Sequence, residues 1–246
     1  MIYVLTYATH SFGNFDEMID NDYGVQFIIL GWGKKWEGYM GKLKMIHEYC
    51  QKLKEDDIVI QLDGFDVWIN DYLSEAIKHF KEKKYKVLFS KETTDDGKYL
   101  GLKPYLNKKV FATTCDGGIT MNAGMYMGYV KYLLPIMEDA LKGNEVDDQR
   151  MFNKLCKSYN ISVDHENKIF ENVYQDSMVE KSKAVFVQYP GKPSIQRWSR
   201  AVSDYVPYLY KELLIILFII IILSCLYICL IPKIKNKKIQ TISSVI

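Results

Sequence analysis

Two aspartates three positions apart offer the clearest chemistry in this sequence. Asp63 and Asp66 lie in the segment Ile58–Trp68, where an apolar run rich in β-branched residues stops at the first acid. Such a run is typical of a buried strand, and Gly64 permits a tight turn that would bring Asp66 back toward Asp63. Two carboxylates placed in this way can bind Mg²⁺ or Mn²⁺ against the phosphates of a nucleotide. A solvated acidic turn is the alternative, and the pair alone does not decide between them.

The segments around this pair alternate between apolar strands and amphipathic helices. We expect strands at residues 2–7, 25–30, 58–63, 87–90, 168–170 and 184–188, a turn and strand within 119–128, and helices at 43–53, 73–84, 131–141 and from about 147 to 159. This alternation predicts an α/β domain with a mostly parallel sheet that is covered on both faces.

Four stretches that could bind a ligand follow the ends of predicted strands. They are Thr9, Gly31–Gly33, Asp63–Asp66 and Ser90–Glu92. Because ligands of such sheets bind beyond the carboxyl ends of the strands, we expect these stretches to share one edge.

Asp147 and Asp148 form a second acidic pair, near the predicted start of a helix. Acids at this position favour the helix dipole, so a purely structural role is as compatible with the sequence as a chemical one.

The charge of the chain argues against a nucleic-acid partner. The formal net charge is +2, but the last 39 residues carry five lysines against one glutamate, so residues 1–207 are slightly acidic. A domain of this kind has no electrostatic support for binding nucleic acid.

The cysteines and histidines show no metal or disulfide pattern. Cys50, Cys115 and Cys156 are widely spaced and form no C-x-x-C pair, which favours reduced structural thiols over a zinc site or a disulfide framework. The four histidines (His10, His47, His79 and His165) are scattered singly, without an H-x-D pair, so we expect no hydroxylase activity. A lone histidine is more often a hydrogen-bonded structural residue.

The C-terminal part contains a predicted membrane span. Residues 213–231 form an uncharged apolar run of 19 residues, about 28 Å long as a helix. We therefore divide the chain into a domain (1–207), a juxtamembrane segment (208–212), a transmembrane helix (213–231) and a basic tail (232–246).

The orientation of this span is open. The lysines of the tail favour the cytosol by the positive-inside rule, which would place the domain in a lumen. Met1 leads directly into an apolar strand without a basic-then-apolar leader, which favours a tail-anchored protein with a cytosolic domain. We prefer the cytosolic orientation, although Asn160-Ile161-Ser162 is a glycosylation sequon.

Eight short motifs follow one another along the chain: Thr6–Thr9, Leu30–Trp36 with Gly41 and Lys44 after it, Asp63–Val67, Leu88–Glu92, Asn122–Gly128, Asp147–Gln149, Asp164–His165 and Ile169–Asn172. In this order they resemble the glycosyltransferase domain of procollagen lysyl hydroxylases and their viral relatives. They are similar to family motifs such as L-G-x-G-x-x-W, D-x-x-D-V, L-F-S-A-E, N-S-G-G-F-I-G and D-D-Q. The resemblance covers about residues 1–207.

This resemblance implies a GT-A fold and transfer of a hexose, glucose or galactose, from a UDP-sugar to a protein or glycan acceptor. Hydroxylysine of a collagen-like protein is one such acceptor. The cofactor implied is Mn²⁺, or Mg²⁺, which would neutralise charge on the UDP leaving group. The residues implied are Asp63, Asp66 and Gln188 for the metal, Thr9, Gly31, Trp32, Gly33, Lys44 and Gly191 for the UDP-sugar, and Asp147 and Asp148 for catalysis. An exposed position on its helix is an equal alternative for Lys44.

The sequence departs from the family in two places. Gln188 stands where the family has a histidine in H-G-N-G-P-T-K, and a glutamine carbonyl is a weaker metal ligand than imidazole. Residues 93–97 replace an aromatic F-C-W-P segment, so the acceptor could differ from collagen.

Two other functions are compatible with the same motifs. A catalytically silent module could keep the fold and tether a partner at a membrane, since fold does not guarantee activity. A transferase of another GT-A family, similar to glycogenin, could act on a different acceptor.

Overall fold

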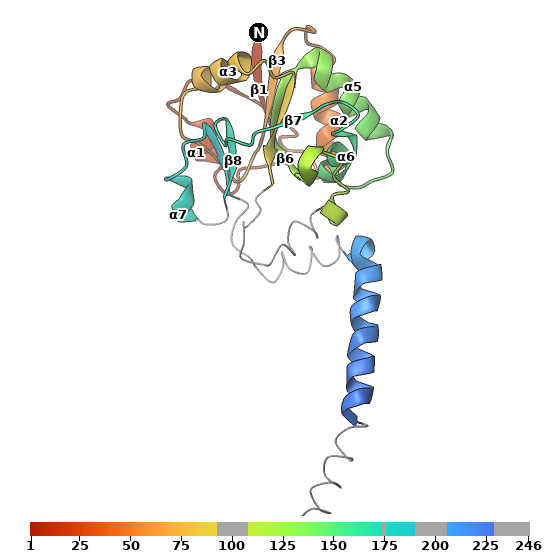
Figure 1. The fold of residues 1–246 in the computed structure, drawn as a ribbon. Helices are drawn as coiled ribbons and strands as arrows, with labels where there is room; N and C mark the ends of the chain where they lie inside the picture. Colours follow the sequence, from red (N-terminus) through yellow and green to blue (C-terminus); the bar gives the residue numbers. More distant parts are fainter. Residues whose placement is uncertain (93–107, 174–175, 190–205, 229–246) are drawn as a thin grey trace, which may run out of the picture. The chain divides into compact units, whose positions relative to one another are not determined.

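A computed structural model of the chain describes residues 1–92, 108–173, 176–189 and 206–228. The chain divides into two compact units, Met1–Pro193 and Ser194–Ile246. A six-stranded sheet forms the centre of the first unit (Figure 1). In spatial order its strands are β2 (Phe27–Leu30), β1 (Ile2–Tyr7), β3 (Ile58–Asp63), β6 (Met121–Tyr129), β5 (Val87–Lys91) and β7 (Ser162–Val163).

Most strands of this sheet run in the same direction. β1 pairs in parallel with both β2 and β3, and β5 pairs in parallel with β7. β6 is antiparallel to β3 and to β5, so β5 runs the same way as β3. The carboxyl ends of β1, β2, β3 and β5 therefore meet at one edge. The expected α/β fold with a mostly parallel sheet is confirmed.

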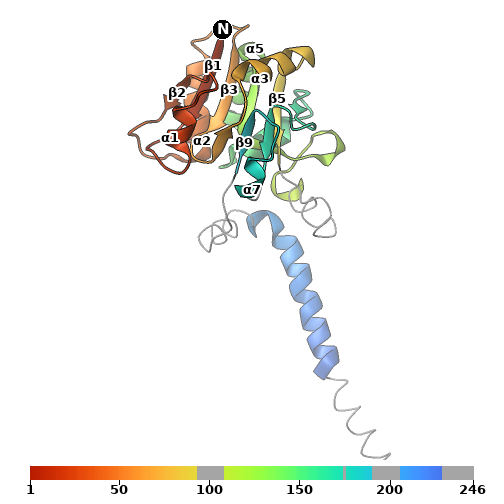
Figure 2. The ribbon, with the colours of Figure 1, turned by 90° about the vertical axis from the view of Figure 1, so that its left-hand side faces the viewer.

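Helices cover both faces of the sheet (Figures 1 and 2). One face carries α2 (Gly38–Cys50), α5 (Val130–Lys142) and α6 (Asp148–Leu155). The other face carries α1 (Phe15–Ile19), α3 (Leu73–Glu82) and a second sheet of β4 (Val67–Ile69), β9 (Phe186–Gln188) and β8 (Phe170–Asn172). Two short helices, η1 (Asp116–Gly118) and α7 (Asp176–Val179), complete the described elements.

The central strands fill a separate core on each face. Successive side chains of a strand point to opposite faces, so Val59 packs with α2 and α5 while Ile60 packs with α3. In β6 the same alternation puts Tyr126 on the first face and Met127 on the second. Burial of one such large side chain stabilises the fold by roughly 1.5–3 kcal/mol.

The second sheet joins two distant parts of the sequence directly after Asp66. β4 begins one residue after this aspartate and is antiparallel to β9, with Val67 opposite Gln188. β9 in turn is parallel to β8. This pairing sets β9 beside the end of β3.

The element boundaries differ from the sequence-based expectations in a few places. β2 begins at Phe27 instead of residue 25, and α2 begins at Gly38, before the expected residue 43. The helix expected to run to 159 ends at Leu155, and the turn after it includes Asn160 at φ 49°. β4 and β7 were not predicted, because two or three residues are too few to show a period.

One prediction about the cysteines is wrong. Cys115 and Cys156 form a disulfide, with 5.1 Å between their Cα atoms, across 41 residues of sequence. Hydrogen bonds from Thr114 bring the two segments together: its N–H donates to the carbonyl of Asn153 at 3.0 Å and its hydroxyl to that of Lys154 at 2.9 Å. Spacing along the sequence does not reveal such a contact between segments. Cys50 is a free thiol in the core, as predicted.

The second unit contains one long apolar helix. It covers Val206–Ile228, with a mean hydropathy of 2.6 and no part of the apolar window buried. By length and composition it can cross a membrane. The predicted span 213–231 overlaps it, and residues 229–231 lie outside the described part of the chain.

Candidate functional site

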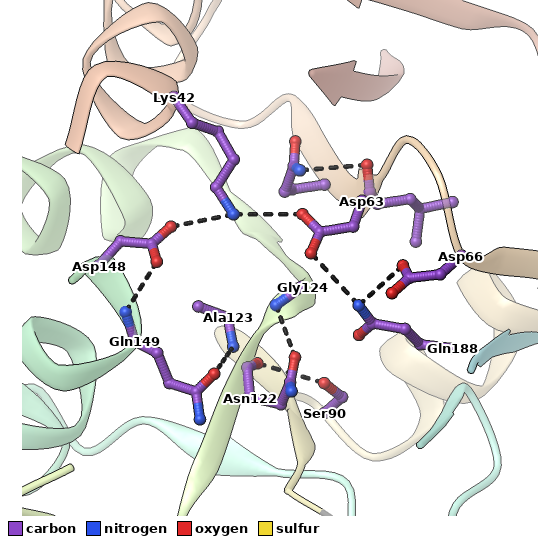
Figure 3. Close-up of polar contacts among 12 residues, drawn as sticks. Lys42, Asp63, Asp66, Ser90, Asn122, Ala123, Gly124, Asp148, Gln149 and Gln188 are labelled. Carbon is purple, nitrogen blue, oxygen red and sulfur yellow. Dashed lines mark hydrogen bonds and ion pairs between the residues drawn. The ribbon is translucent and has the colours of Figure 1, made fainter. Parts of the chain in front are cut away.

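Asp63 and Asp66 converge on one amide group. Asp63 is the last residue of β3, Asp66 lies in the turn before β4, and Gln188 is the last residue of β9. The side-chain Nε2 of Gln188 donates to Oδ2 of Asp63 at 3.2 Å and to Oδ1 of Asp66 at 3.0 Å. Figure 3 shows the three side chains pointing toward one another. Both carboxylates therefore face the same small space at the carboxyl edge of the sheet.

Gly64 allows the turn between the two aspartates to pack against β1. A Cβ atom at this position would lie 2.8 Å from the carbonyl oxygen of Tyr7 and 3.1 Å from the hydroxyl oxygen of Thr6. Gly64 is not among the glycines with positive φ. The glycine is therefore needed for the close approach of this turn to β1 and not for a positive-φ conformation.

Gly124 leaves room for the same group of side chains. A Cβ atom on Gly124 would lie 2.3 Å from Oε1 of Gln188 and 2.8 Å from Oδ2 of Asp63. Its N–H donates to Oδ1 of Asn122 at 2.7 Å, which holds this part of β6 in place (Figure 3). The Asn122–Gly128 motif thus supplies the space in which the Gln188 amide lies.

Lys42 connects the two acidic pairs. Its Nζ lies 3.2 Å from Oδ1 of Asp63 and 3.0 Å from Oδ2 of Asp148 (Figure 3). The residue is only 5% exposed, because it lies on the buried face of α2. Lys44, which the sequence analysis named, is exposed on the same helix.

Lys42 was missed although its spacing carried a signal. Lys42, Ile46 and Cys50 are four residues apart, so they share one face of α2, and all three are buried. A lysine in the apolar stripe of a helix requires acidic partners, because burial of an unpaired charge is costly.

Burial and charge set the protonation of this group. Burial by itself would lower the pKa of Lys42, but the carboxylates of Asp148 and Asp63 outweigh it and raise that pKa well above its ordinary value. Burial raises the pKa of Asp148 to about 6, against the attraction of Lys42 and with added repulsion from Asp147 and Asp63. Burial also raises the pKa of Tyr126, whose phenol stays neutral. Near pH 7 the site therefore holds an ionised Lys42–Asp148 pair.

The two acids of the second pair have different surroundings. Asp147 is the N-cap of α6, where its Oδ1 accepts from the N–H of Gln149 at 2.8 Å and of Arg150 at 3.2 Å. Asp148 is 3% exposed and faces Lys42. The predicted structural role at the start of the helix is confirmed for Asp147.

Glu92, at the end of β5, accepts hydrogen bonds from residues of β6 and α6 beside the two acidic pairs. Its Oε2 accepts from the side-chain amides of Asn122 and Gln149, both at 2.9 Å. The residue directly follows β5, so the fourth predicted stretch also reaches the carboxyl edge.

The remaining predicted residues lie at the ends of β1 and β2. The N–H of Gly33 donates to the carbonyl of Thr9 at 2.9 Å, so the two loops are joined. Gly31 and Gly33 have φ of 82° and 72°, a conformation that favours glycine. Trp32 is 53% exposed and stacks on Phe15 with 5.1 Å between ring centroids. Gly191 lies outside the described residues.

Three aromatic rings lie beside the aspartate turn and were not predicted as site residues. The ring of Phe65 lies 5.5 Å from that of His10 and 5.8 Å from that of Phe12, between centroids. Phe12 is 66% exposed. An exposed ring next to a polar site is a surface on which a flat base can stack.

The ligand set suits a hard divalent cation. Among the described residues, no three His, Cys, Asp or Glu side chains come together as metal ligands, so the donors available are two carboxylates and the Gln188 amide. Oε1 of Gln188 is buried and has no hydrogen-bond partner among the described residues. Rotation of the amide exchanges Oε1 with Nε2, and three oxygen donors then face one point. Oxygen ligands are those that Mg²⁺ and Mn²⁺ prefer, so the residues fit the ion.

Fold and site together define an α/β protein with an acidic candidate site at the carboxyl edge of its sheet, where ligands of such sheets bind. Residues 1–187 match the family described as the PLOD GT domain. The chain therefore belongs to the family of glycosyltransferase domains of procollagen lysyl hydroxylases.

Curated relatives share the same family. The chain is 29% identical over 126 residues to chicken procollagen-lysine,2-oxoglutarate 5-dioxygenase 1, a match covering 49% of this chain and 16% of that enzyme. It is 25% identical over 190 residues to the Drosophila melanogaster enzyme, covering 70% of this chain and 26% of that enzyme. It is 26% identical over 190 residues to human procollagen-lysine,2-oxoglutarate 5-dioxygenase 2, a match covering 69% of this chain and 25% of that enzyme. The chain thus spans about a quarter or less of the length of these relatives.

Proposed function

We propose that this protein is a membrane-anchored, divalent-metal-dependent glycosyltransferase that moves glucose or galactose from a UDP-sugar to a protein or glycan acceptor. The observation that carries the proposal is the convergence of Asp63 and Asp66 on the Gln188 amide. This convergence lies at the edge where ligands of parallel sheets bind. Membership of the family supports sugar transfer, and the apolar helix Val206–Ile228 supports the anchor.

Asp63, Asp66 and Gln188 would hold Mn²⁺ or Mg²⁺. The ion would offset the negative charge that develops on the UDP leaving group as the glycosidic bond breaks. Lys42 contributes by holding Asp63, since its Nζ lies 3.2 Å from Oδ1 of that carboxylate. The lysine thereby leaves Oδ2, which Gln188 contacts, directed toward the metal position.

Asp148 acts through Lys42. Its carboxylate is 3% exposed and paired with Nζ of Lys42 at 3.0 Å, which favours a positioning role over direct contact with an acceptor. When Asp148 is ionised, it fixes the lysine beside Asp63. Asp147, which caps α6, keeps Asp148 at the first turn of this helix.

The uridine side of the donor would lie along the ends of β1 and β2. Thr9, Gly31, Trp32 and Gly33 remain our predicted contacts there, because the hydrogen bond from Gly33 to Thr9 joins the two loops. The rings of Phe12 and Phe65 offer a stacking surface beside Asp66. Lys44 and Gly191 also remain predictions.

The acceptor class follows from the relatives. Their names describe action on procollagen lysine, so we propose a lysine-derived side chain of a collagen-like protein as the first acceptor to test. Hydroxylation is not part of the proposal, because the family matched is that of the glycosyltransferase domain.

A silent binding module is the second candidate, and one observation favours it. Nε2 of Gln188 donates to both carboxylates, so an amide hydrogen-bond donor faces the acids where a cation would bind. Such an arrangement satisfies the aspartates without any metal.

Release of UDP distinguishes these functions. The full-length chain in detergent is incubated with UDP-glucose or UDP-galactose and Mn²⁺, with and without a collagen-like peptide containing hydroxylysine. We expect UDP release that Asp63→Asn and Asp66→Asn abolish, while Asp22→Asn, at an exposed position, leaves it unchanged.

UDP release that survives both site variants would contradict the proposed metal site. Absence of release with every UDP-sugar, together with absence of Mn²⁺-dependent UDP binding, would favour the silent module.

A further inference from the structure

A disulfide stabilises the region around the end of α6. Cys115 and Cys156 are 8% and 2% exposed, and their bond joins the segment before η1 to the C-cap of α6. Disulfides form and persist in oxidising compartments and are rare in the cytosol. The fold therefore contains a covalent bond that depends on the compartment where the domain matures.

The turn after this disulfide carries Asn160. The N–H of Ile161 donates to the carbonyl of Cys156 at 3.0 Å, so the turn is held by a disulfide-bonded residue. Ile161 is buried, and Ser162 begins β7 at the edge of the sheet. Asn160 itself is exposed, with φ of 49°. Its side chain is thus exposed to solvent on a turn that hydrogen bonds hold to Cys156 and Lys157.

Asn160-Ile161-Ser162 is also the single N-x-S/T triplet of the whole sequence. The surface beside it is open: Asn160 borders a hollow of about 560 Å³ that is also lined by Tyr85, Lys157 and His165. A glycan at this position would meet no packed surface, and it would cover the edge of β7.

We propose that the domain matures in an oxidising, glycosylating compartment, where Asn160 receives an N-linked glycan and Cys115 and Cys156 form their disulfide. This reverses the cytosolic orientation expected from the sequence. The inference does not depend on the transferase activity.

Both modifications have a defined chemistry. In glycan transfer, Nδ2 of Asn160 forms a bond to the anomeric carbon of a sugar carried on a polyprenyl diphosphate. The bond from that carbon to the diphosphate oxygen breaks, the lipid diphosphate leaves and Nδ2 loses one proton. In disulfide formation, the two thiols lose two protons and two electrons, and the disulfide of an oxidised dithiol carrier is reduced to two thiols.

The charges that flank the apolar run do not decide the orientation. Arg197, Arg200 and Lys211 lie within 20 residues before residue 213, and four lysines lie within a similar distance after residue 231. This difference of one is too small for the positive-inside rule to orient the span. The disulfide and the exposed sequon carry the conclusion instead.

The glycan is tested on the full-length chain expressed in eukaryotic cells. We expect peptide N-glycosidase to lower the mass of the wild-type chain by the mass of one N-linked glycan. The Asn160→Asp variant should show no glycosidase-sensitive mass, and aspartate tolerates the positive φ at this position. The Ser162→Thr variant preserves the sequon, so it should keep the glycosidase-sensitive mass. A wild-type chain without a glycosidase-sensitive mass would overturn the proposal.

The disulfide is tested on the same cells by alkylation in denaturant without reductant. We expect Cys50 to be labelled and Cys115 and Cys156 to be labelled only after reduction. Labelling of all three to the same extent before reduction would overturn the proposal even if a glycan were found. Neither result alters the UDP-release assay, so failure of this inference and failure of the proposed activity are distinguishable.

Discussion

At the scale of single residues, the site depends on which atom of the Gln188 side-chain amide faces the two aspartates. Its Nε2 satisfies Asp63 and Asp66, while its buried Oε1 lacks a partner among the described residues. Binding a cation requires the amide to turn, and the hydrogen bonds to both carboxylates are then lost. This exchange reduces the net gain from metal binding.

Gln188→His is therefore expected to strengthen Mn²⁺ binding. Imidazole is a better ligand for Mn²⁺ than an amide, and we expect the affinity to rise roughly tenfold, or about 1.4 kcal/mol. Isothermal titration of the full-length chain with Mn²⁺ measures the effect, with Gln188→Leu as the control that removes the third ligand. Equal affinities for the histidine and leucine variants would show that residue 188 does not bind the ion.

Asp148 is expected to make the proposed release of UDP depend on pH. Its pKa is raised to about 6 by burial, so the carboxylate is ionised above that pH and takes up a proton as the pH falls through about 6. The ion pair with Lys42 is then lost, and we expect kcat/KM to fall about tenfold per pH unit below 6. Asp148→Asn should remove this acidic limb from the pH profile of UDP release.

Asp147→Asn is the matched control for this profile. An asparagine can still cap α6, so the acidic limb should remain, moved toward lower pH because the repulsion from Asp147 that raises the pKa of Asp148 is lost. An Asp148→Asn profile with the same limb as the wild type would contradict the role of the buried carboxylate.

At the scale of elements, three strands assemble the site. β3 supplies Asp63, β9 supplies Gln188, and β6 passes close to both at Gly124. α2 and α6 contribute Lys42 and Asp148 from the face that they cover. Side chains of a small polar site are held in position more precisely by strands and helices than by loops.

Gly124→Ala should displace the Gln188 amide and leave the fold intact. The added Cβ would lie 2.3 Å from Oε1 of Gln188, and the end of a flexible side chain can move away. We expect weaker Mn²⁺ binding, because the third ligand is pushed from Asp63. The measurement is again Mn²⁺ titration.

A double-mutant cycle identifies the cause of this effect. In a Gln188→Ala background the clash with the amide is absent and only the 2.8 Å approach to Oδ2 of Asp63 remains, so Gly124→Ala should have a smaller effect on Mn²⁺ affinity. An equal loss in both backgrounds would show that the effect comes from Asp63 or from β6 and not from displacement of Gln188.

At the scale of the whole molecule, the disulfide links chain segments that lie far apart in sequence. It closes a loop with a sequence separation of 41 residues, which reduces the entropy of the unfolded chain. From this loop length we expect reduction to lower the free energy of unfolding by about 4 kcal/mol.

Urea unfolding of the full-length chain in detergent, with and without dithiothreitol, measures this difference. The Cys115→Ser/Cys156→Ser double variant is the control, since its stability should not respond to the reductant. A wild-type chain equally stable under both conditions would contradict the predicted contribution.

The local pattern of residues alone predicted several elements of this fold, the acids at the end of β3 and the family. The apolar run ending at Asp63 predicted a buried strand with acids at its end, and the uncharged run after residue 212 predicted an apolar helix. Both follow from the sequence because strand alternation and hydrophobicity are properties of neighbouring residues. The order of the family motifs likewise indicated the family that the comparison then showed.

Only the tertiary structure placed Lys42 between Asp63 and Asp148 and Cys115 against Cys156, and it brought Gln188 beside Asp66 as the family resemblance implied. These partners are separated by 21 to 122 residues, and their contacts depend on which strands pair and which helices pack on a shared face. Such packing is decided by the burial of the whole core, so no local pattern of residue types encodes it.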